Sequence, residues 1–111
     1  HMVALQDTAL AAMKPGIPCS DVDKAVRAYY EAHDLLPFWK HHSGHTIGLR
    51  YHEGPFLDVG DHTIIQPGMV FTVEPGLYGR NDGGVRVEDM LVVTDGAARN
   101  LNSLQDGLDW S

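Results

Sequence analysis

The chain has 111 residues, of which 43% are hydrophobic and 21% charged, and eight basic against fifteen acidic side chains give a formal charge of −7. These proportions are typical of a soluble globular domain. No apolar run approaches the roughly 18 residues that span a bilayer, and the few Lys and Arg residues disfavour nucleic acid, because phosphate-backbone binding depends on dense positive charge. We therefore expect neither a membrane nor a nucleic-acid partner.

The single cysteine, Cys19, excludes an internal disulfide and any zinc site built from several cysteines. It fits a reducing compartment, so we expect a cytoplasmic protein. A chain of this length forms one domain. We interpret His1 and Met2 as a remnant of cloning.

Two helices are predicted in the first third of the chain. The segment 3–14 is rich in Ala, Leu and Met, which favours a helix that stops at Pro15 and Gly16. A second helix is predicted to begin at a Ser20 cap and to end before Pro37, because apolar side chains recur at helical spacing between them. Both helices are expected to cover a core.

The rest of the chain has the pattern of strands. Alternating apolar and polar residues predict a half-buried strand over 46–52, followed by a loop. Further strands are predicted at 63–65, 69–74 and 85–94, with the glycine-rich segment 76–84 as a hairpin connection. The sequence therefore predicts an α+β domain, in which two helices lie on an antiparallel sheet of about four strands.

Histidines are concentrated in one short segment, because His41, His42, His45 and His52 fall within twelve residues. A single histidine is more often a hydrogen-bonded or surface residue than a ligand, but four histidines close together make a ligand role more probable. No His-Glu-x-x-His motif is present, because Phe56 stands where its second histidine would be needed. A metallopeptidase of the zincin type is therefore excluded.

Two glutamates, Glu74 and Glu88, stand within otherwise apolar strand segments. A hairpin centred on residue 81 would place them directly opposite each other, with Cβ atoms about 5 Å apart on one face. Such carboxylates can coexist if one is protonated, if a guanidinium such as Arg86 intervenes, or if divalent cations lie between them, and a solvated pair on an exposed face is the alternative. Together with an imidazole they suit Mn²⁺, Co²⁺, Fe²⁺ or Zn²⁺ and metal-assisted hydrolysis.

Four ordered motifs resemble the carboxyl-terminal half of the pita-bread (creatinase/aminopeptidase) metallopeptidases. They are GHTIGL at 44–49, HEGP at 52–55, PGMVFTVEPGLY at 67–78 and GVRVED at 84–89. The last motif is similar to that of the proline-specific members, Xaa-Pro dipeptidase (prolidase) and Xaa-Pro aminopeptidase. The resemblance covers residues 3–103, so we expect one half-domain there and a carboxyl-terminal tail over 104–111.

This resemblance implies a dinuclear metal centre in which a metal-bridging hydroxide hydrolyses the bond before proline. His45 would bind one metal ion, Glu88 would bridge both, and Glu74 would be a ligand that also accepts a proton. The ions would be Mn²⁺ or Co²⁺, with Zn²⁺ and Fe²⁺ as further candidates. A proline-containing peptide would be the substrate.

The resemblance also implies roles for four residues around the metal centre. His52 would contact the substrate carbonyl, and His41 would line the proline side of the pocket. Arg86 would orient a metal-binding carboxylate, with Tyr78 a weaker candidate for the same neighbourhood.

In the family, two aspartates on a hairpin before the first helix complete the metal centre, and Asp7, Asp21 and Asp23 do not match that motif. We therefore expect this chain to be inactive alone. A non-catalytic protein-binding module on the same fold and creatinase-like hydrolysis of a non-peptide substrate are the alternatives. Because the family fold has two similar halves, we also expect a homodimer in which a second copy covers the bared face.

Overall fold

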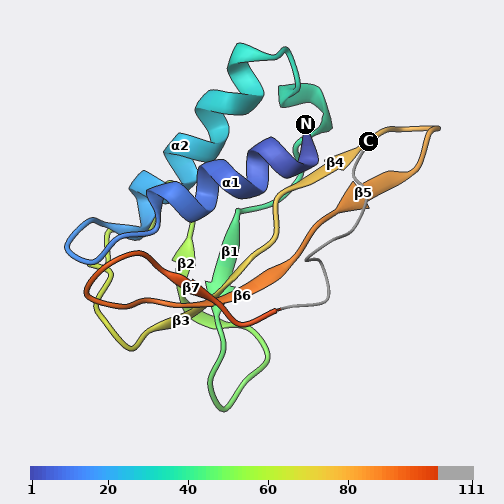
Figure 1. Cartoon of the computed structure of the whole chain (residues 1–111). Helices are drawn as coiled ribbons and strands as arrows, with labels where there is room; N and C mark the ends of the chain where they lie inside the picture. The colour runs from blue at the N-terminus through green and yellow to red at the C-terminus, as the bar shows by residue number, and fades with distance from the viewer. Residues whose placement is uncertain (103–111) are drawn as a thin grey trace.

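The computed structural model describes residues 1–102, and the predicted tail at 104–111 lies outside this part. Figure 1 shows its two layers, with the helices on one side of the strands. Both predicted helices are confirmed: α1 (Met2–Ala12) and α2 (Cys19–Ala32) pack against each other, and a short 3₁₀ helix, η1 (Leu36–Phe38), follows. No helix among the described residues is long and apolar enough to cross a bilayer.

The helix ends differ slightly from the prediction. The turn after α1 contains Gly16 at φ 91°, a conformation that glycine adopts without steric cost. Ser20 is not the cap of α2, because the extended backbone of Pro18 already places Cys19 in the first turn. Pro37 lies inside η1, where a proline is tolerated because the first turn of a helix needs no N–H donor from it.

The main sheet is antiparallel and has five strands, in the order β2-β1-β3-β6-β7. A separate two-stranded ribbon, β4-β5, extends from it. The strands are β1 (Gly44–Thr46), β2 (Glu53–Leu57), β3 (Val70–Val73), β4 (Gly76–Tyr78), β5 (Gly84–Arg86), β6 (Asp89–Val92) and β7 (Arg99–Asn100).

The strand predicted over 46–52 is wrong in its extent. β1 ends at Thr46, where a register shift follows His45, and 47–52 is the loop that protrudes at the bottom of Figure 1. The alternation in this segment does not reflect burial, because Leu49 is fully exposed. The segment predicted as a loop contains β2 instead.

Three further strand predictions need correction. The 63–65 strand is reduced to one isolated bridge, between Pro18 and Ile64. The predicted 85–94 strand is divided into β5 and β6, and β4 occupies part of the predicted connection at 76–84. Strand β7 was not predicted. The overall prediction of two helices on an antiparallel sheet nevertheless holds.

The hydrophobic core lies between the helices and one face of the sheet. The helices contribute Leu5 of α1 and Val26 of α2. The sheet contributes Phe71, Val73 and Leu91, and all five side chains are completely buried. Because side chains alternate along a strand, the residues between these face the opposite side. That opposite face carries the candidate site.

Candidate metal and active site

The predicted hairpin register is confirmed. Val73 pairs with Asp89 on one side of the site, and Gly76 pairs with Arg86 on the other. Both pairs are centred on residue 81, so the intervening Glu74 and Glu88 come from facing positions of the two chain segments. This geometry follows from the pairing of β3 with β6 and of β4 with β5, and it does not depend on the family resemblance.

His45 and Glu74 meet across neighbouring strands. The His45 Nε2 atom lies 3.0 Å from Glu74 Oε1, and both residues are buried, with 1% and 8% exposure. The His45 Nδ1–H donates to the carbonyl of Thr46 at 2.9 Å, because that oxygen can only accept. Nε2 and the carboxylate oxygen would then be two acceptors in contact, so a proton or a cation between them is required.

Arg86 lies between the two glutamates. Its Nη2 is 3.5 Å from Glu88 Oε2, and its Nε is 3.9 Å from Glu74 Oε2. Contact with the Tyr78 hydroxyl is the largest cause that raises the pKa of Arg86, and Glu88 and Glu74 raise it further. A permanent cation therefore accompanies the carboxylates, one of the three arrangements that the sequence left open.

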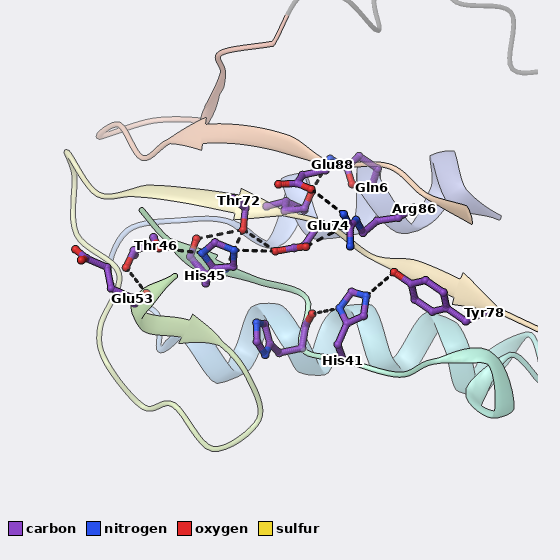
Figure 2. Close-up of polar contacts among 12 residues, drawn as sticks. Gln6, His41, His45, Thr46, Glu53, Thr72, Glu74, Tyr78, Arg86 and Glu88 are labelled. Atoms are coloured by element: carbon purple, nitrogen blue, oxygen red, sulfur yellow. Dashed lines mark hydrogen bonds and ion pairs between the residues drawn. The ribbon is translucent and has the colours of Figure 1, made fainter. Parts of the chain in front are cut away.

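His41 and Tyr78 form a second polar contact beside this pair. The His41 Nδ1–H donates to the His42 carbonyl at 2.8 Å, so Nε2 accepts from the Tyr78 hydroxyl at 2.7 Å. Figure 2 shows this contact beside those that Arg86 makes with the two glutamates, and the Tyr78 hydroxyl also contacts Arg86. The structure thus brings six predicted site residues into one connected group: His45, Glu74, Glu88, Arg86, Tyr78 and His41.

His52 is at the edge of the site. It is the last residue of the loop 47–52 and is exposed, yet its ring centroid lies 4.2 Å from that of His45. His42, the histidine without a predicted role, packs against Phe56 with ring centroids 5.3 Å apart, and burial lowers its pKa. The His42 ring also lies 6.2 Å from that of His45, so all four clustered histidines lie in or beside the site.

Thr72 is a site residue that the sequence prediction missed. Its hydroxyl donates to Glu74 Oε1 at 3.0 Å and accepts the His45 backbone N–H at 3.0 Å. The side chain is 1% exposed. Its position two residues before Glu74, which directly follows β3, was the available signal, because residues i and i+2 of an extended segment share a face.

The donor set fits a metal ion in part. The Thr46 carbonyl fixes the tautomer of His45 so that Nε2 points at Glu74, which is the arrangement by which proteins orient metal-binding imidazoles. Glu88 instead contacts Arg86, and within residues 1–102 no three His, Cys, Asp or Glu side chains are grouped closely enough to hold a metal. The described residues therefore supply an incomplete ligand set.

Comparison with known proteins identifies a family. A model of metallopeptidase family M24 matches residues 1–95. The probable dipeptidase PepE of Mycobacterium tuberculosis is 37% identical over 98 residues, which are 88% of this chain and 26% of that protein. The Xaa-Pro dipeptidase of Pyrococcus furiosus is 35% identical over 100 residues, 90% of this chain and 29% of that protein.

The same relationship holds for structure. The prolidase of Pyrococcus horikoshii superimposes with a TM-score of 0.91 and 32% identity, over 97% of this chain and 31% of that chain. This confirms the predicted fold class, the carboxyl-terminal half of the pita-bread fold. The chain spans only 26% to 31% of the length of these relatives. Because the family model matches residues 1–95 of the 111, the chain belongs to metallopeptidase family M24.

Proposed function

We propose that this chain is part of a dinuclear-metal-dependent hydrolase that cleaves the peptide bond before proline. The observation that carries the proposal is the buried pair of His45 and Glu74, with the His45 tautomer fixed by a backbone carbonyl and Glu88 at the facing position. The similarity to an Xaa-Pro dipeptidase and a prolidase supports the substrate class.

In this proposal His45, Glu74 and Glu88 are metal ligands. Two divalent ions, Mn²⁺ or Co²⁺ in the first instance, would polarise the scissile carbonyl and lower the pKa of the attacking water when bound. Glu74 Oε1 accepts the proton of that water and passes it to the leaving imino nitrogen of proline. Thr72, which donates to the same oxygen, keeps the carboxylate in place.

The remaining site residues bind and orient in this proposal. His52, beside the His45 ring, contacts the substrate carbonyl, and His41 lines the side of the pocket that receives proline. Arg86 orients Glu74 and Glu88 by contacting both carboxylates, and Tyr78 contacts both Arg86 and His41.

The isolated chain is expected to be nearly inert, because the described residues provide no complete metal site. The test is hydrolysis of an Xaa-Pro dipeptide in millimolar Mn²⁺ or Co²⁺, where we expect no turnover above background. Turnover comparable to that of a full-length relative would contradict the need for further ligands.

Residual metal binding separates a peptidase fragment from a binding module. We expect calorimetric titration with Mn²⁺ to show weak binding that Glu88→Gln reduces by about tenfold or more, because one ligand oxygen loses its charge. Glu31→Gln, at an exposed position of α2, is the matched control and should leave binding unchanged. If Glu88→Gln and the wild type behave alike, the protein-recognition alternative is favoured.

We also propose that a second copy covers the sheet face opposite the helices. Val70, Met90 and Val92 lie on that face at half-buried positions and do not pack against the core. Light scattering at tens of micromolar should give a dimer mass, and Met90→Lys should shift it to a monomer, because a charge cannot be buried in the contact without cost. A monomeric wild type would contradict the proposal.

A cytoplasmic location is the last part of the proposal. Cys19 is free and buried, and burial raises the pKa of its thiol to about 11, so this cysteine stays protonated and takes part in no disulfide among the described residues. Cell fractionation of the source organism would test the location.

The net charge of −7 supports the absence of a nucleic-acid partner.

A further inference from the structure

Asp23 is a buried acidic residue that the proposed chemistry does not use. It lies on α2, its side chain is 0% exposed, and its position matches no metal-binding motif. A carboxylate in such an environment costs free energy unless it is paired and hydrogen-bonded. The identity of its partners therefore indicates what the charge is for.

The Asp23 carboxylate has partners on two sides. Oδ2 accepts from Arg27 Nε at 2.8 Å, and the Arg27 guanidinium lies 4.0 Å above the centre of the Trp39 ring. Oδ1 accepts from both the backbone N–H and the hydroxyl of Ser43, at 3.1 and 2.6 Å. Arg27, on the same helix, therefore balances the negative charge through Oδ2, while Oδ1 connects the helix to Ser43, which directly precedes β1.

Ser43 connects this carboxylate to the site. It is 1% exposed and comes two residues before His45. Its carbonyl accepts the backbone N–H of Glu74 at 2.8 Å. The backbones of the adjoining strands are in close contact next to Ser43, because a Cβ at Gly44 would collide with the carbonyl of Thr72.

We propose that Asp23 is a positioning residue for the site and that, through Ser43, it fixes the backbone of Glu74 and the beginning of the strand that carries His45. This inference rests on the proposed function only in taking His45 and Glu74 as residues of the metal site. The hydrogen-bonded path itself runs from a helix carboxylate through a serine to the peptide group of Glu74.

The test is nuclear magnetic resonance of the full chain with Asp23→Asn and Ser43→Ala. We expect the Glu74 amide to exchange with solvent about tenfold faster or more in each variant, relative to the Leu91 amide, because a charge-assisted hydrogen bond is lost. The ring nitrogen signals of His45 should shift in the same variants. Ser43→Thr keeps the hydroxyl and should restore both readouts.

A purely structural role predicts a different result. Asp21→Asn is the matched control, since it removes the same charge from the same helix at a side chain that is 47% exposed. If Glu74 and Leu91 amides accelerate equally and the His45 signals stay unchanged, the proposal is overturned. If Asp23→Asn does not fold, Ser43→Ala decides the question, because it removes only the hydroxyl contact. Neither readout requires metal or peptidase activity, so failure of the proposed function would leave this result standing.

Discussion

The two faces of the central sheet differ sharply although they are built from the same strands. On the helix side, Phe71 and Val73 are completely buried in an apolar core. On the other side, Thr72 and Glu74 carry polar groups that contact His45 and Arg86, and Arg86 is 48% exposed. The difference indicates that one face maintains the fold and the other is available for chemistry. Consecutive residues of a strand point to opposite faces, so neighbours in the sequence serve different roles.

The largest expected effect is on the core face. Phe71→Ala removes a fully buried ring, and we expect the free energy of unfolding to fall by about 3–5 kcal/mol, from lost burial and from the cavity that remains. Urea denaturation followed by circular dichroism measures it. A loss below about 1 kcal/mol would show that this face is not the tightly packed one.

A smaller effect is expected where a helix holds the backbone next to the site. The hydroxyl of Tyr30 donates to the Gly76 carbonyl at 2.7 Å and accepts the Gly76 N–H at 3.1 Å, and burial raises its pKa to about 12. Tyr30→Phe should cost about 1–3 kcal/mol, because two buried backbone groups lose their partner. The control is Tyr29→Phe, which removes a hydroxyl that contacts His1 at an exposed position; it should cost less than about 0.5 kcal/mol.

The chemical face should contribute little to stability. Glu88 is 33% exposed beside a half-exposed Arg86, so Glu88→Gln is expected to change the free energy of unfolding by about 0–1 kcal/mol. The same denaturation experiment measures it at low and high salt. A cost above about 2 kcal/mol would remove the contrast between the faces.

The smallest effect concerns the loop after β2 and depends on pH. Burial raises the pKa of Asp61, but hydrogen bonds from Phe56 N–H and Thr63 outweigh burial, so the pKa is lowered overall. A carboxyl with a lowered folded pKa stabilises the fold above its unfolded pKa, and this stability is lost as pH falls through the folded value. Melting temperatures below pH 5 should therefore fall more steeply for the wild type than for Asp61→Asn. Parallel curves would contradict this assignment.

Much of the site could be predicted because it depends on local pattern. The first helix followed from its composition and the second from residue spacing, and the facing positions of Glu74 and Glu88 followed from one hairpin centre. The 46–52 strand failed because alternation reports burial only where a neighbouring strand is present, and the chain leaves the sheet after Thr46.

Ser43 and Asp23 could not be identified from their own sequence context, and for Thr72 the only local signal was its position two residues before Glu74. The contacts that connect Asp23 to Ser43 and Thr72 to His45 join residues at least 20 positions apart. Such pairings depend on how α2, β1 and β3 are stacked, which no short-range pattern reports.

The sequence by itself determined the two helices, the hairpin register and the residue types of the site, since these depend on periodicity and on neighbours along the chain. Only the tertiary structure decided that His45 Nε2 meets Glu74, that Arg86 lies between the glutamates, and that a buried helix carboxylate reaches the sheet. The physical reason is that hydrogen bonds and ion pairs act over about 3–4 Å, so distant residues interact only after packing has fixed their positions.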